Sequence, residues 1–155
     1  MKKAIKIFVI ALFAVFIILQ FIRPARNNPA VIEAETLESA AAVPEDVEAI
    51  LTRSCSDCHT NKTVYPWYSN ISPFNRFLAG HIDEGRRELN FSVWNTYEKR
   101  RKNRKLDAVC EQITDREMPL PSYLWIHRDA ELSDEDIKVL CDWTLAEKAK
   151  IARTQ

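Results

Sequence analysis

The chain has 155 residues, enough for one ordinary domain and a short additional segment. Its 22 Lys and Arg residues balance its 22 Asp and Glu residues, so the dominant basic field that marks nucleic-acid binders is absent. The charges are unevenly placed, however. Residues 1–26 carry five bases and no acid, and residues 27–50 carry six acids and no base. This distribution predicts regions with different tasks and no nucleic-acid partner.

Residues 1–26 are predicted to be an uncleaved signal anchor that crosses the membrane once. Three lysines within the first six residues precede an apolar run over residues 7–22, which only Gln20 interrupts. This length is close to the roughly 20 residues that span a bilayer, and no small-residue cleavage pattern follows the run. A cleaved signal peptide is the main alternative, and a buried core helix fits least. Because N-terminal lysines favour the cytoplasmic side, we expect the remaining chain to leave the cell inner membrane on its periplasmic face.

Residues 27–43 are rich in Ala, Glu, Asn and Pro and show little apolar periodicity. This composition predicts a flexible, solvated linker. The folded domain is therefore expected over residues 44–150.

The domain is expected to be all-α, because no alternating strand pattern occurs and the chain has only two glycines. Apolar residues recur at helical spacing between Phe74 and Ile82 and between Leu106 and Ile113. The pair Ser133 and Asp136 predicts a capping box before the last helix. Helix starts are expected near Pro44, Ser72, Ser92 and Ser133.

Cys55-Ser56-Asp57-Cys58-His59 forms the pattern C-x-x-C-H, whose spacing suits c-type haem attachment. Thiols three positions apart can each add to a vinyl group on one porphyrin edge, and the adjacent imidazole then lies beneath the iron. We therefore expect one covalent haem c, held through Cys55 and Cys58, with His59 as the proximal iron ligand.

Other uses of the motif fit less well. A thioredoxin-like redox pair would need a strand–helix setting, which the sequence does not predict. A zinc site could recruit Cys110 and Cys141, but these intervals are unlike the short pairs of structural zinc sites. A disulfide between Cys55 and Cys58 would leave His59 unexplained.

Met118 is the expected sixth ligand of the iron. It precedes Pro119, which favours an extended backbone that can present a thioether to the far haem face, and His/Met ligation raises the reduction potential. The alternative is that Met118 fills a gap in the core. His81 or His127 could take its place as ligand, and an empty sixth position would indicate gas sensing or peroxide chemistry.

Several polar side chains are candidates for the haem propionates. Tyr65, Trp67 and Trp94 each combine an aromatic ring with a hydrogen-bond donor, and Arg86 or Arg87 could pair with a carboxylate. Core packing for the aromatic rings, and solvation for the arginines, are the alternatives.

Cys110 and Cys141 both fall on apolar stripes, so a disulfide between them and two free buried thiols are both open. The basic run over residues 99–105 is expected on a solvated helix face, or as a docking patch for an acidic redox partner.

The order of motifs along the chain resembles the bacterial haem-binding domain family of C-x-x-C-H proteins. The resemblance spans about residues 45–146 and is carried by Cys55–His59, Tyr65–Asn70, His81, Glu84–Arg87, Leu89–Ser92, Trp94, Glu117–Met118–Pro119, Pro121, Tyr123, His127 and Leu132–Ser133. It implies a small membrane-tethered or periplasmic monohaem protein, similar in layout to cytochrome c and sometimes joined to peroxidase-like or other cytochrome modules. It also implies attachment through Cys55 and Cys58, a proximal His59 and a distal Met118. The Cys110 and Cys141 pair is not part of that pattern.

The combined expectation is a small cytochrome c-like helical domain around one covalent haem, preceded by a transmembrane anchor. Its expected task is periplasmic electron transfer to redox partner proteins, such as another cytochrome or a peroxidase module, without enzyme activity of its own. The alternatives are a peroxidase-like or ligand-sensing haem protein with an open iron, and a zinc-stabilised interaction module.

Overall fold

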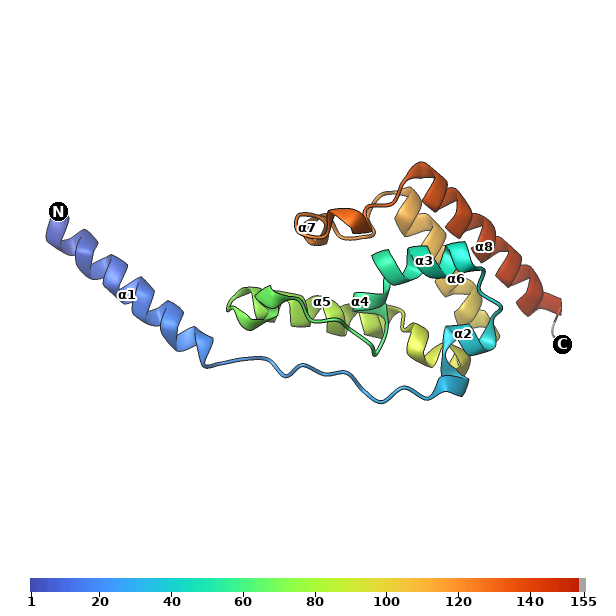
Figure 1. Cartoon of the computed structure of the whole chain (residues 1–155), viewed down its shortest axis with the longest axis horizontal. Coiled ribbons are helices and arrows are strands. Elements are labelled where there is room, and N and C mark those ends of the chain that lie inside the picture. Colours follow the sequence, from blue (N-terminus) through green and yellow to red (C-terminus); the bar gives the residue numbers. More distant parts are fainter. Residues whose placement is uncertain (154–155) are drawn as a thin grey trace.

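The computed structural model describes residues 1–153, and every regular element among them is a helix. The absence of strands in this part of the chain confirms the predicted all-α class (Figure 1). The elements, with η marking 3-10 helices, are α1 (Lys2–Gln20), η1 (Glu33–Glu35), α2 (Leu37–Ala40), α3 (Glu45–Ser54), α4 (Ser56–His59), η2 (Trp67–Asn70), α5 (Phe74–Glu88), η3 (Phe91–Thr96), α6 (Lys99–Thr114), α7 (Pro121–Leu124), η4 (Arg128–Ala130) and α8 (Asp134–Arg153).

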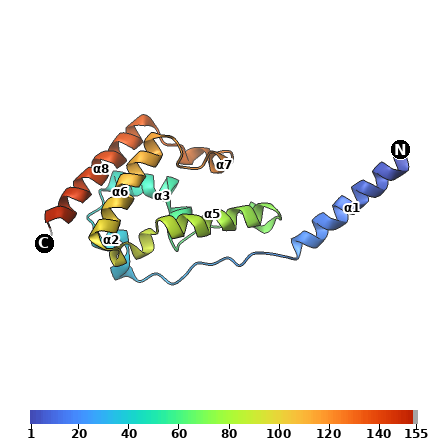
Figure 2. The ribbon, with the colours of Figure 1, turned by 180° about the vertical axis from the view of Figure 1, so that it is seen from behind.

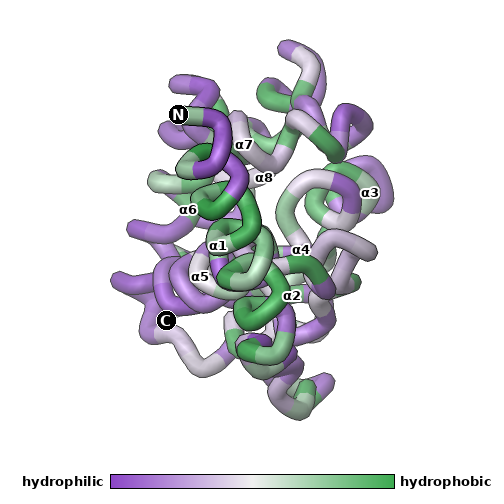
Figure 3. Tube along the Cα trace, turned by 90° about the vertical axis from the view of Figure 1, so that its left-hand side faces the viewer, coloured by the Kyte–Doolittle hydropathy of each residue, from purple (hydrophilic) through white to green (hydrophobic). Residues whose placement is uncertain are grey.

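Helix α1 projects away from the remaining helices and buries none of its residues (Figure 1). Its length and apolar composition suffice to cross a membrane. Figure 3 shows the apolar colouring along most of α1 and the hydrophilic colouring at its N-terminus. A membrane span and an N-terminal signal sequence both have this length and composition.

The core of the domain lies among α3, η3, α6 and α8. Helix α3 begins with three acids, which suit the positive end of its dipole, and buries Val47, Ile50, Leu51 and Ser54 on one face. Leu106 from α6 and Leu140 from α8 are almost completely buried in the same core. The predicted capping box opens α8, since Ser133 Oγ accepts from the Asp136 amide while the Asp136 carboxylate accepts from the Ser133 amide.

Two segments differ from their sequence-based predictions. Leu37 and Ala41 are buried in the core, so the second half of the 27–43 segment packs against η3 rather than forming a solvated linker. The helix predicted to begin near Ser92 is instead the short η3, because Val93 leaves the helical region of φ and ψ. The regular helix α6 begins later, at Lys99.

Helix α4 is one turn long and is held between α3 and α5. The chain bends at Cys55 after α3, and α4 then lies so close to α5 that Gly85 fits only because it has no side chain. A Cβ at Gly85 would lie 2.8 Å from the Cys58 carbonyl oxygen and 3.2 Å from the Cys58 Cβ. Helix α5 and the segment with α7 both extend from the core towards the side where α1 lies (Figures 1 and 2).

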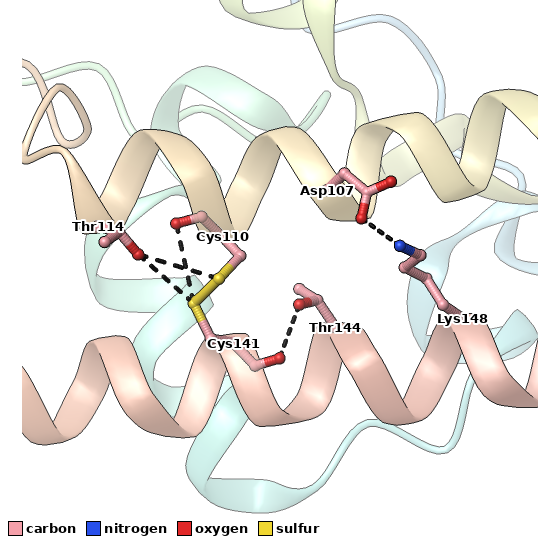
Figure 4. Close-up of a disulfide and its surroundings, with 6 residues drawn as sticks. All are labelled: Asp107, Cys110, Thr114, Cys141, Thr144 and Lys148. Carbon is pink, nitrogen blue, oxygen red and sulfur yellow. Dashed lines mark hydrogen bonds and ion pairs between the residues drawn. A yellow bond between two sulfur atoms is a disulfide. The ribbon is translucent and has the colours of Figure 1, made fainter.

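A disulfide between Cys110 and Cys141 joins α6 to α8 (Figure 4). Their Cα atoms are 5.0 Å apart, and an ion pair between Lys148 and Asp107 links the same two helices. The pairing that the sequence left open is therefore a disulfide in this structure.

Replacing both bridged cysteines, as Cys110→Ser with Cys141→Ser, should lower the free energy of unfolding by about 3 kcal/mol, because the unfolded chain gains the entropy of an open loop. Denaturant unfolding of the full-length protein measures this difference. Wild-type protein in a reductant should match the double variant. Equal stability of the wild type with and without reductant would contradict a stabilising bridge.

Replacing Gly85 with Ala should destabilise the protein by about 1–3 kcal/mol, because the added methyl group pushes α4 away from α5. Gly80→Ala in the same helix is the matched control. Nothing lies within 4 Å of its added Cβ, so this change should stabilise α5 by about 0.5–1 kcal/mol. Thermal unfolding followed by circular dichroism tests both variants, and the idea of a close approach fails if they shift in the same direction.

Candidate functional site

The C-x-x-C-H motif lies where three adjoining hollows meet, and together we call them the motif cavity. Cys55 and His59 line the first and third hollows, and Cys58 lines the first and second. Their volumes are about 150, 530 and 250 Å³. The second hollow alone falls within the roughly 300–1,000 Å³ of sites for small molecules and cofactors.

The imidazole of His59 is fixed by two backbone carbonyls. Its Nδ1 lies 2.9 Å from the Leu89 oxygen and 3.1 Å from the Gly85 oxygen. Because carbonyls only accept hydrogen bonds, Nδ1 must carry the proton and Nε2 keeps its lone pair. Burial lowers the pKa of His59, and these two hydrogen bonds oppose that shift. A neutral imidazole with an oriented, unprotonated Nε2 is what a metal ligand requires.

Cys55 and Cys58 are both unpaired and half-buried. Burial raises the pKa of Cys55 to about 12 and that of Cys58 to about 11, with a smaller contribution from Asp57 in the second case. Both thiols are therefore neutral near pH 7, whereas redox-active cysteines have lowered pKa values. This environment therefore indicates two neutral thiols in fixed positions and argues against a reactive thiolate pair.

The zinc alternative lacks the donors it would need. Cys110 and Cys141 are joined to each other, so neither is free to bind a metal. Over residues 1–153 no group of three or more His, Cys, Asp or Glu side chains is placed to hold a metal ion.

Met118 and His81 share the motif cavity with His59. Met118 lines the first and third hollows, and its segment is fixed because the Met118 amide donates to the Gln112 carbonyl at 3.1 Å. His81 lines the first and second hollows, and its ring packs edge-on against Phe77. Nε2 of His81 is buried and has no hydrogen-bond partner. The structure thus brings two candidate ligands of the sixth position to one cavity.

A polar network links α4 to α7 beside the cavity, and the sequence did not predict it. The Tyr123 hydroxyl donates to the Asp57 carboxylate at 2.9 Å, and burial with the negative charge of Asp57 raises the pKa of Tyr123. The Tyr123 ring stacks on His127, whose Nε2 is hydrogen-bonded to the Tyr68 hydroxyl at 2.9 Å. His127 therefore already has a partner. Asp57 inside the motif was the available signal, because a carboxylate accepts hydrogen bonds, here from the Tyr123 hydroxyl and the Val64 amide.

Three residues predicted to contact the cofactor lie outside the motif cavity. The Tyr65 hydroxyl donates to the Asn27 carbonyl at 3.4 Å, and Trp67 is largely exposed. Arg86 donates to the Thr60 carbonyl at 2.7 Å and also to Thr63 and two residues of the 27–43 segment. Contacts of these three side chains with propionates stay predictions.

The side chains of the motif cavity fit a haem. Two neutral thiols and one imidazole with a free Nε2 come from a single turn of chain, which is the donor set that c-type attachment needs. The second hollow adds apolar walls from α5 and α7, lined by Phe74, Phe77, Leu78, Leu120, Trp125 and Ile126. Such walls exclude water from a large apolar cofactor.

One of three comparisons with known proteins gives a match. The family model described as a haem-binding domain matches residues 14–146, which include the motif, His81 and Met118. No curated protein and no solved structure matches the chain. Because the family match covers most of the sequence, the chain belongs to the haem-binding domain family, and its cofactor is haem.

Proposed function

We propose that this protein is a membrane-anchored monohaem c-type cytochrome that transfers electrons in the periplasm. The observation that supports this most is the shared cavity of Cys55, Cys58 and His59, where both thiols are unpaired and Nε2 of the imidazole is free. Each thiol would add across one vinyl double bond of the haem. Its sulfur would bond to one carbon and its proton would go to the other, so no oxidant would be consumed. When bound, haem supplies one iron that carries a single electron.

Met118 is the proposed sixth ligand, because it lines the cavity together with His59 and offers a thioether that favours ferrous iron. The unpartnered Nε2 of His81 makes this residue the alternative. Either ligand would close the iron to small molecules, which suits an electron carrier rather than a peroxidase-like enzyme.

A periplasmic location is supported by two independent features. Helix α1 is apolar enough to span a membrane and follows N-terminal lysines, which favour the cytoplasmic side for that end. The disulfide between Cys110 and Cys141 suits an oxidising compartment.

The partners proposed are redox proteins, such as another cytochrome or a peroxidase module. Arg100, Arg101 and Arg104 surround a polar hollow beside α6, and Lys105 from the same basic run lines the third hollow of the motif cavity. A basic surface that reaches the cofactor cavity would steer an acidic partner towards it.

Covalent attachment is tested by Cys55→Ala with Cys58→Ala, expressed together with haem-maturation machinery. The wild type should carry haem that survives denaturing electrophoresis and adds the mass of one haem, because thioether bonds resist denaturation. The double variant should lose this signal, whereas Cys110→Ser with Cys141→Ser should keep it. Wild-type protein without the added mass would overturn the cytochrome proposal.

The sixth ligand is tested by comparing Met118→Ala with His81→Ala. Met118→Ala should lower the reduction potential and let the reduced protein bind carbon monoxide, because the ligand that stabilises ferrous iron is lost. His81→Ala should change neither. Carbon monoxide binding by reduced His81→Ala but not by reduced Met118→Ala would assign the sixth position to His81. Carbon monoxide binding by the wild type would instead indicate an open iron and a peroxidase-like or ligand-sensing protein.

A further inference from the structure

We propose that one edge of the haem domain lies in the headgroup region of the bilayer that α1 crosses. The edge consists of Val64, Trp67, Phe74, Phe77, Trp125 and Ile126, and we call it the aromatic edge. This inference rests on the proposed membrane anchor and is independent of how haem is attached.

The aromatic edge gathers most of the exposed apolar side chains of the domain. Its six residues are between 56% and 75% exposed. Of the large hydrophobic residues described after residue 22, only Ile32 and Leu145 are otherwise so exposed. A concentration of this kind on one edge marks an interaction surface, because single exposed apolar residues would be scattered.

Charge is almost absent from the two segments that carry the edge. Residues 63–82 contain one charged side chain, Arg76, and residues 118–126 contain none, although 28% of the whole chain is charged. The edge has no acid that would repel anionic headgroups. Tryptophan favours the membrane interface because its ring is apolar and its indole N–H is polar.

Contacts at the end of α1 place the edge at the membrane surface. Gln20, the only polar residue of the apolar run, pairs with the backbone of Ser72. Its side-chain amide donates to the Ser72 carbonyl at 3.2 Å and accepts from the Ser72 amide at 2.9 Å. Arg26 donates to Ser69 Oγ at 2.9 Å and also to Asn70. The segment between η2 and α5, which carries Trp67 and Phe74, therefore sits where the helix leaves the bilayer.

The second part of the edge lies on the same side of the domain. Trp125 and Ile126 follow α7, whose segment extends towards the side of α1 together with the start of α5 (Figures 1 and 2). The proposal requires that one flat surface contacts both parts when α1 spans the membrane.

Haem alone does not explain the edge. Val64 and Trp67 line none of the three hollows of the motif cavity, so a bound haem leaves them exposed. Phe74, Phe77, Trp125 and Ile126 line the second hollow, and each is more than half exposed. The edge therefore forms the rim of the cofactor cavity, and lipid headgroups cover that rim.

The test places a nitroxide label at single positions of the full-length, haem-loaded protein in nanodiscs that contain anionic phospholipid. Trp67→Cys and Trp125→Cys probe the edge, and Leu145→Cys on α8 is the matched control, because Leu145 is an exposed apolar residue away from it. With haem on Cys55 and Cys58 and the Cys110–Cys141 disulfide formed, the new thiol is the only free one. Spectra are recorded in the reduced state to limit broadening by ferric iron.

Relaxation by oxygen, which concentrates in lipid, is compared with relaxation by a water-soluble nickel chelate. The ratio of relaxation by oxygen to relaxation by nickel should be higher for labels at positions 67 and 125 than for the label at position 145. A nickel response at 67 and 125 equal to that at 145 would overturn the inference. Exclusion of both reagents at 67 and 125 would also overturn it, in favour of a protein–protein contact.

The haem absorbance of the same samples separates this inference from the proposed function. Water-exposed labels on a haem-loaded protein reject the aromatic edge and leave the cytochrome intact. If no haem attaches, the labels are read in a Cys55→Ala, Cys58→Ala background. Lipid-facing labels there would support the edge while the cytochrome proposal fails.

Discussion

The site depends on the hydrogen bonds from Nδ1 of His59 to the carbonyl oxygens of Gly85 and Leu89. These bonds select the tautomer of the imidazole, orient its Nε2 towards the cavity and tie the short helix α4 to the end of α5. The one-turn α4 is too short to be stable by itself, so its contacts with α5 fix its position. Both the ligand geometry and the placement of the two cysteines therefore follow from one close contact, which only a glycine at position 85 permits.

The sequence was most informative where chemistry restricts spacing. The positions of Cys55, Cys58 and His59 predict the site without any knowledge of the fold, because attachment to one porphyrin edge allows little variation. Helical periodicity and the Ser133–Asp136 capping box likewise identified the class and the last helix. Leu37 was missed because a single buried leucine among polar and small residues produces no periodic pattern. Trp67 and Arg86 were assigned from side-chain chemistry alone. Tertiary contacts, which the local sequence does not encode, leave both side chains outside the hollows of the motif cavity, and their contacts with propionates stay predictions.

Helix α1, the disulfide and the helical core each bear on where the protein is located or how the motif cavity is built. Helix α1 is long and apolar enough to cross a membrane, and the disulfide between α6 and α8 would suit the oxidising side of the membrane that the proposed anchor crosses. The core of α3, η3, α6 and α8 supports one wall of the motif cavity, while α5 and the α7 segment supply the others. A domain of this size buries little surface, so a covalent cofactor that fills the space between these walls would also contribute to its fold.

The hydrogen bonds of Arg86 limit how far the haem domain can move from helix α1. Its guanidinium donates hydrogen bonds both to Asn27 and Asn28 and to Thr63, in the loop that follows the motif. If residues 27–43 were a flexible chain, its root-mean-square end-to-end distance would be roughly 20 Å, and the domain could move from α1 by about that distance. Hydrogen bonds hold the beginning of the 27–43 segment and its second half packs into the core, so little of it is left to act as a free tether. In the proposed cytochrome the haem domain would therefore stay close to its membrane anchor. An electron donor would have to reach it by diffusing in the plane of the membrane or by docking from the solvent.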